Sequence, residues 1–134
     1  MPTPSLNGAF IDLDAVPNVA KTKPSQLRLP DGSIINVALW KDVLRECCKY
    51  ALASNDHIPI PLPDRAGRKV SLLNMVKPAT GISHIEAEYQ GQTIYVYTNY
   101  DANNCVSNAV YILNYVPSSA SNVKAGVMYQ KIEP

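Results

Sequence analysis

The sequence predicts an α+β domain in which two helices pack on one face of a mostly antiparallel sheet. Two segments, residues 39–54 and 102–116, space their apolar residues as one face of a helix does. Two other segments place the dipeptides Asp31-Gly32 and Gln90-Gly91 between short apolar runs, as β-hairpins do. The expected order is hairpin, helix, strand, hairpin, helix.

Length, charge and cysteine content indicate the number of domains and the cellular compartment. The chain has 134 residues, enough for one domain whose core needs no disulfide or metal. Charged residues make up 17% of the chain, below the roughly 25% usual for soluble domains. The net charge of the whole protein is only +1, which is too small to attract polyanions by itself. We expect a cytoplasmic protein, because no apolar run approaches the ~20 residues of a membrane span and no signal peptide is visible. Three cysteines, two of them adjacent, favour a reducing compartment.

Residues 1–24 are expected to form an N-terminal arm, and residues 25–134 a single α+β domain. Prolines and a glycine prevent a long helix in the arm. An apolar island lies within it, made of Phe10, Ile11, Leu13 and Val16. A solvated linker is one interpretation. The other, which we prefer, is that segment 9–16 buries these side chains on its own sheet edge or on that of a second copy, and we predict self-association by strand exchange.

The first hairpin and the first helix follow the arm. In residues 26–37, two apolar runs flank the turn at Asp31-Gly32. The helix of residues 39–54 then repeats apolar residues at i, i+3, i+4, i+7, i+8 and i+11, which are Trp40, Val43, Leu44, Cys47, Cys48 and Ala51. Both cysteines are therefore predicted to face the core, where a thiol acts as a small hydrophobe.

The middle of the chain is predicted to be extended. Residues 55–68 alternate proline with isoleucine and leucine, which excludes a helix. A strand is expected at 69–74, a turn at 77–81, and the second hairpin at 83–98. Helix 102–116 should end at Pro117, and the tail can add a last strand.

A polar cluster joins the second hairpin to the second helix. Asp101 stands immediately before the apolar-periodic run, where its carboxylate can cap the helix. Tyr100 and Cys105 occupy the positions of a hydrophobic staple. The remaining polar groups exceed what one cap requires and are candidate ligand contacts at a helix N-terminus: Thr98, Asn99, Asn103 and Asn104.

A two-residue turn at Gln90-Gly91 fixes which side chains of the second hairpin share a face. One face is apolar; on the other, His84 opposes Tyr97, Glu86 opposes Tyr95 and Glu88 opposes Thr93. Phenol, carboxylate and imidazole together can bind a sugar or base, or move a proton. The candidate ligand site therefore comprises His84, Glu86, Tyr95, Tyr97, Thr98, Asn99, Asp101 and Asn103. The alternative is a solvated sheet face beside a capped helix.

Two other functions are open. A phosphate-binding strip for a nucleotide or nucleic acid would use Lys41, Arg45, Lys49, Arg65, Arg68 and Lys69. A metal-dependent nuclease-like hydrolase would use Asp64, Glu86 and Glu88, although Glu88 stands where that pattern has a lysine. No cysteine lies at zinc-ligand spacing from a histidine, and no motif marks a nucleophile, so we expect no metal and no cofactor.

Two stretches, LRLPDGSIINVALWKDVL and IYVYTNYDANNCVSNAVYIL, carry a resemblance. Over about residues 24–116 the chain resembles a small C-terminal α+β module of uncharacterised prokaryotic proteins, some associated with restriction or phage defence. The shared pattern is Leu-Pro-Asp-Gly, a Trp-Lys-Asp-Val-Leu helix start and a strand-Thr-Asn-Tyr-helix junction. The resemblance assigns no residue role, and Leu39 stands where a serine-like cap is expected.

Together these observations predict a non-enzymatic binding or assembly module of a prokaryotic or phage protein. The module would self-associate through its arm and could bind a protein or a small nucleotide-like ligand as a further partner. We expect no membrane among its partners. The nucleic-acid-binding domain and the metal-dependent hydrolase are the alternatives.

Overall fold

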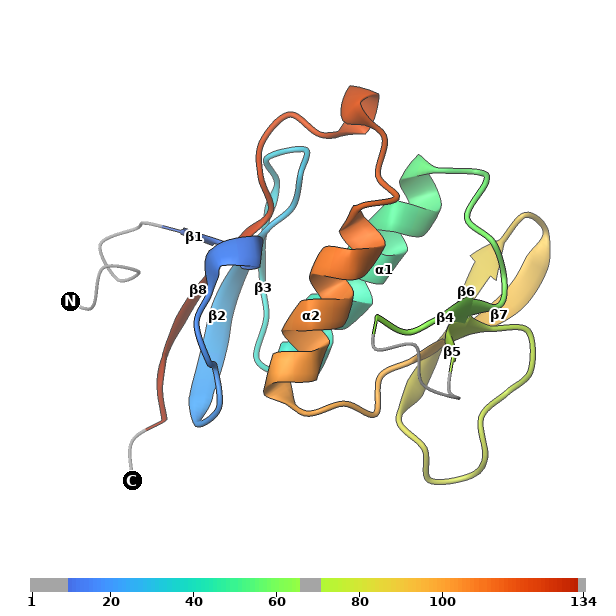
Figure 1. The fold of residues 1–134 in the computed structure, drawn as a ribbon, viewed down its shortest axis with the longest axis horizontal. Helices are drawn as coiled ribbons and strands as arrows, with labels where there is room; N and C mark the ends of the chain where they lie inside the picture. The colour runs from blue at the N-terminus through green and yellow to red at the C-terminus, as the bar shows by residue number, and fades with distance from the viewer. Residues whose placement is uncertain (1–9, 66–70, 133–134) are drawn as a thin grey trace.

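The computed structural model describes residues 10–65 and 71–132 and confirms the α+β class. Within these residues, helices α1 (Trp40–Ser54) and α2 (Ala102–Leu113) pack side by side in the middle of the molecule (Figure 1). The strands of the described residues form two antiparallel sheets of four strands each, and the helix pair lies between these sheets. No helix in this part of the chain has the length and apolar character needed to cross a bilayer.

The first sheet joins the two ends of the described chain. Its order is β1 (Ile11–Asp12), β8 (Gly126–Lys131), β2 (Thr22–Arg28) and β3 (Ile34–Asn36). The predicted first hairpin connects β2 to β3. Gly32, at φ 91°, donates its N–H to the Leu29 carbonyl at 2.8 Å, and closes a tight turn that requires a positive φ. The expected tail strand is β8, which lies inside the sheet.

The second sheet has the order β4 (Leu62–Pro63), β5 (Ser71–Asn74), β7 (Gln92–Tyr97) and β6 (His84–Tyr89). The predicted register of the β6–β7 hairpin is confirmed at every position, from His84 opposite Tyr97 to Tyr89 opposite Gln92. Gln90 and Gly91 have φ values of 56° and 77°, which is the two-residue turn with positive φ at both positions that hairpins favour.

The core lies between the helices and both sheets. The predicted face of α1 is confirmed, because Trp40, Val43, Leu44, Cys47, Cys48 and Ala51 are all buried. The predicted length of α2 is wrong: it ends at Leu113, and residues 114–116 continue with i→i−3 hydrogen bonds. Pro117 explains this, since a proline disfavours helical geometry in the residue before it. Leu113, the last residue of α2, is half-buried.

The start of α1 compensates for the leucine at its cap position. The carboxylate of Asp42 accepts hydrogen bonds from the backbone N–H groups of Leu39 at 3.0 Å and Ala38 at 3.1 Å. This is the half of a capping box that the third helical residue supplies. The helix therefore begins without the serine-like side chain that the resemblance led us to expect.

The described part of the arm, residues 10–24, docks on its own chain. Ile11 pairs with Val127 in the β1–β8 ladder, and the Leu13 N–H donates to the Ala125 carbonyl at 2.8 Å. Leu13 opens the short 3-10 helix η2 (Leu13–Ala15) and is 2% exposed. Of the apolar island, Leu13 is buried and Phe10, Ile11 and Val16 are half-buried within one chain. Strand exchange with a second copy stays a prediction.

Candidate functional site

Two residues of the predicted polar cluster serve the local fold. Asp101 is confirmed as the cap of α2, because its Oδ1 accepts from the Asn104 N–H at 2.8 Å. Thr98 is fully buried, and its hydroxyl shares a hydrogen bond of 2.6 Å with Ser83 while its N–H donates to the Ser83 carbonyl at 2.9 Å. These contacts fix the path of the chain from β7 into α2.

Asn103 contacts the arm. Its Oδ1 accepts from the Val19 N–H at 2.8 Å, and its Nδ2 donates to Asn18 Oδ1 at 2.9 Å. Asn99, between the strand and the helix, is exposed. Thr98, Asp101 and Asn103 therefore have structural partners in the fold. The role of these residues and of Asn99 in ligand binding stays a prediction.

The strand half of the predicted site is brought together on the outer face of the second sheet. Glu86 is exposed opposite Tyr95, and the ring of His84 lies edge-on to Tyr95 with centroids 6.0 Å apart. His84 Nδ1 lies 2.7 Å from the Ile82 carbonyl. Because a carbonyl oxygen only accepts, Nδ1 is the donor in this contact.

Tyr97 belongs to an aromatic cluster at the end of this face. Its ring packs edge-on against Tyr100 at 5.1 Å, and the Tyr100 hydroxyl donates to Asp64 Oδ2 at 3.1 Å. Asp64 is 2% exposed, so its carboxylate is removed from solvent behind Tyr100. Tyr97 also borders a hollow of about 300 Å³ with Asn74 and Ile82.

The three carboxylates of the hydrolase alternative are not brought together. Asp64 follows β4 and Glu86 and Glu88 lie on β6, and these strands form opposite edges of the second sheet. Glu88 accepts a hydrogen bond from Thr93 at 2.6 Å. Among the described residues, no group of three histidine, cysteine or acidic side chains is placed to hold a metal ion.

The basic residues of the phosphate-binding alternative have nearby carboxylates. Arg45 pairs with Asp42 at 2.9 Å, and Lys49 with Glu46 at 3.4 Å. Lys41 precedes them on α1 and Arg65 is exposed after β4. Arg68 and Lys69 lie outside the described residues. Each ion pair reduces the charge that α1 can offer to a phosphate.

The three thiols are buried in the helix pair, as predicted for Cys47 and Cys48. Burial raises the pKa of both groups well above the ordinary value. Burial also raises the pKa of Cys105, to about 12. A thiol that stays protonated is a poor nucleophile and metal ligand, so these three side chains act as core residues.

A concave site that the sequence reasoning missed lies beside β6. A groove of about 270 Å³ runs between this strand and α1, and its walls are formed by Lys49, Leu52, Ala53, Glu86, Ala87 and Glu88. β6 is the outermost strand of the second sheet, so its outer edge pairs with no other strand of the described chain. The sequence fixes the register of the hairpin, but the order of strands in the sheet depends on contacts that no local pattern records.

Comparison of the chain with protein-family models, with curated proteins and with solved structures finds no match. The site is therefore interpreted from its own geometry.

Proposed function

We propose that this chain is a non-enzymatic binding and assembly module that takes an extended segment of a partner protein as an added strand on β6. The observation that carries the proposal is the outer edge of β6, a strand of six residues that pairs only with β7 among the described residues. Such an edge offers a row of backbone donors and acceptors to another extended chain.

The groove beside β6 supplies side-chain selectivity. An added strand would point alternate side chains to opposite faces of the sheet. On the α1 side these side chains meet Leu52, Ala53 and Ala87, which form an apolar floor with room for medium-sized apolar groups. On the outer side they meet the exposed carboxylates of Glu86 and Glu88. The partner segment that fits best alternates apolar and basic residues.

The same carboxylates restrict which strands can pair. Charged residues on an exposed edge discourage indiscriminate association with other sheets. An apolar strand would remove water from the carboxylates, and an acidic strand would repel them. Glu86 and Glu88 therefore act against unspecific pairing and in favour of a basic partner.

Two blocked hexapeptides test the proposal, one alternating valine with lysine and one alternating valine with glutamate. We expect the lysine peptide to bind, with amide chemical shifts concentrated on β6 and α1, and the glutamate peptide to bind at least about tenfold more weakly, a difference of ~1.4 kcal/mol. The double variant Glu86→Lys/Glu88→Lys should reverse the preference. Asp56→Lys/Thr80→Lys/Gln130→Lys, which changes the net charge equally at exposed positions away from β6, is the control.

Two results would contradict the proposal. One is a wild-type protein that binds neither peptide. The other is binding whose charge preference persists in the β6 double variant, or changes equally in the control variant, since the attraction would then arise from the whole protein.

Self-association through segment 9–16 is a second proposal for assembly. Among the described residues, β1 pairs with β8 at Ile11 and Asp12. Identical contacts can form with β8 of a second copy by domain swapping. Association with prokaryotic restriction or phage defence rests on the sequence resemblance alone and stays a prediction.

A further inference from the structure

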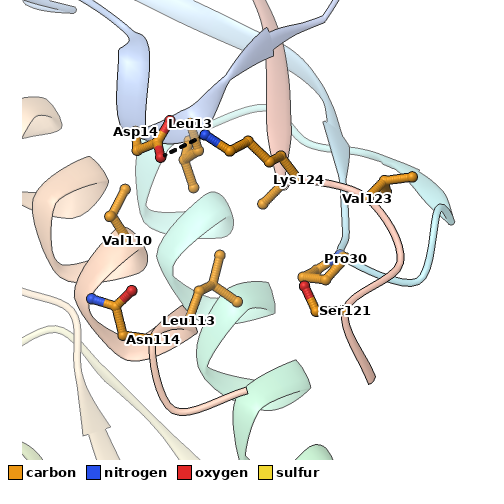
Figure 2. A pocket seen from close by; sticks show the side chains of 10 residues that line it. Leu13, Asp14, Pro30, Val110, Leu113, Asn114, Ser121, Val123 and Lys124 are labelled. Atoms are coloured by element: carbon orange, nitrogen blue, oxygen red, sulfur yellow. Dashed lines mark hydrogen bonds and ion pairs between the residues drawn. The ribbon is translucent and has the colours of Figure 1, made fainter. Parts of the chain in front are cut away.

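A separate pocket lies where the arm meets α2 and the chain that leads into β8 (Figure 2). It has a volume of about 140 Å³. Its apolar walls come from Leu13 of the arm, Val110 and Leu113 of α2, and Val123 of the loop before β8. Leu113, which the helical pattern places in the core, is half-buried and borders this hollow.

Hydrogen bonds hold the walls of the pocket in place. The Leu13 N–H donates to Ala125, and the N–H groups of Asn122 and Val123 both donate to the Pro30 carbonyl at 2.8 and 3.0 Å. The Tyr50 hydroxyl donates to the Ala120 carbonyl at 2.6 Å and fixes the short helix η3 (Ser118–Ala120). The pocket is therefore formed before any ligand arrives, which lowers the entropic cost of binding.

Opposite charges stand side by side at the mouth of this pocket. Lys124 Nζ lies 3.3 Å from Asp14 Oδ2, and the two side chains are 66% and 50% exposed. An ammonium group has three N–H donors and a carboxylate has two acceptor oxygens, so each retains capacity after pairing with the other. Figure 2 shows the pair spanning from the arm to the loop beside the apolar walls.

We propose that the pocket binds a free α-amino acid with an apolar side chain of about the size of leucine. The side chain would lie between Val110 and Leu113, the α-carboxylate would bind Lys124, and the α-ammonium would bind Asp14. The volume limits the apolar group, because a cavity of about 150 Å³ holds a molecule the size of benzene. The charge pair selects the zwitterion, since a fatty acid would meet the Asp14 carboxylate and an alkylamine would meet Lys124.

Four ligands test the assignment by titration calorimetry: L-leucine, glycine, leucinamide and 4-methylpentanoate. Glycine lacks the apolar group, leucinamide the carboxylate, and 4-methylpentanoate the ammonium. We expect saturable binding of leucine, and binding at least about tenfold weaker for each of the other three. Equal binding of leucine and its two singly charged analogues would overturn the zwitterion assignment, and an absence of saturable leucine binding at millimolar concentration would overturn the site.

Two variants locate the binding within the protein. Val123 is 41% exposed, so Val123→Phe can fill the pocket from its rim without replacing a core residue, and leucine binding should be lost. Lys124→Ala should weaken leucine binding at least about tenfold and leave the weak binding of leucinamide unchanged. Lys131→Ala, an exposed lysine of β8, should bind leucine as the wild type does. Wild-type affinity in Val123→Phe or in Lys124→Ala, with an unchanged melting temperature, would overturn the proposal.

Discussion

The side-chain amide of Asn103 binds the backbone of Val19, a residue 84 positions earlier in the chain. Its oxygen accepts from the Val19 N–H at 2.8 Å, and Val19 itself is fully buried. A residue in the first turn of α2, which the sequence suggested as a ligand contact, thus fastens the arm to the helix. The position of the arm depends on this amide as well as on the short β1–β8 ladder.

Replacing Asn103 by alanine should destabilise the protein by about 1 to 3 kcal/mol, because the Val19 N–H would lose its acceptor at a partly buried site. The measurement is urea denaturation with an unchanged slope. Asn103→Asp is the matched control, since it keeps an acceptor oxygen for the Val19 N–H. It loses the bond to Asn18 and adds a negative charge in the first turn of α2, where such a charge is tolerated. An alanine variant that unfolds at the wild-type urea concentration would show that the amide contributes nothing to arm docking.

The cap of α2 gives a second prediction. Asp101→Ala should cost ~1 kcal/mol of stability, whereas Asp101→Asn or Asp101→Ser should largely keep it, because each can accept from the Asn104 N–H. Thermal and urea unfolding of the three variants provide the comparison. If Asp101→Asn loses a ligand or partner at an unchanged melting temperature, Asp101 also belongs to a binding site.

Local signals explain what the sequence predicts well. The register of β6 and β7 depends on the turn at Gln90-Gly91 and on alternation within twelve residues, which the chain displays openly. The face of α1 follows from a spacing that places Trp40 to Ala51 on one side. The position of Asp101 before an apolar-periodic run suffices to predict its role as a helix cap.

Long-range pairing explains what the sequence did not reveal. β8 pairs with β1 and β2, about a hundred residues earlier, and this contact divides the strands between two sheets instead of one. Polarity alone placed Thr98 among the ligand contacts, but its hydroxyl has a buried partner in Ser83. Edges and grooves arise from strand order and packing, so neither the exposed edge of β6 nor the pocket at the arm had a local signal.

The two leucines that helical spacing placed in the core should now differ. Leu44 is fully buried, so Leu44→Ala should destabilise by about 2 to 5 kcal/mol. Leu113 borders the arm pocket and is half-buried, and Leu113→Ala should cost clearly less because part of its surface already faces a hollow. Urea unfolding of both variants tests the difference. Equal losses of unfolding free energy in the two variants would mean that the pocket beside Leu113 is filled in solution.

The buried thiols predict how stability depends on pH. Burial raises the pKa of Cys105 to about 12 in the folded chain, and raises the pKa of Cys47 and Cys48 as well. The folded state therefore holds the thiol protons more tightly than the unfolded state does. The contribution of the protonated thiols to the free energy of unfolding is fully present below the ordinary thiol pKa, and it is lost as the pH rises above that pKa. The urea midpoint should fall between about pH 8 and about pH 10.

A matched variant separates the thiols from other groups that titrate in that range. Burial also raises the pKa of Tyr50 and Tyr111, so part of the fall belongs to phenols. In Cys105→Ala, the urea midpoint should fall less steeply with rising pH than in the wild type, when each protein is compared with its own midpoint at neutral pH. An alkaline profile as steep as that of the wild type would contradict the assignment to Cys105.

Removal of the arm tests both its docking and its role in assembly. Deleting residues 1–20 removes Leu13 and Val19, two side chains that are 2% and 0% exposed, and full burial of a leucine or valine contributes about 1.5 to 3 kcal/mol each. The truncated chain should therefore unfold at markedly lower urea concentration. It should also expose the outer edge of β8, to which β1 is paired.

Light scattering of the full and truncated chains then decides between docking within one chain and exchange between two. If strand exchange assembles the protein, the full chain is a dimer or larger and the truncated chain is a monomer. A full chain that is already monomeric ends the exchange proposal, and an unchanged multimer after truncation moves assembly to another surface.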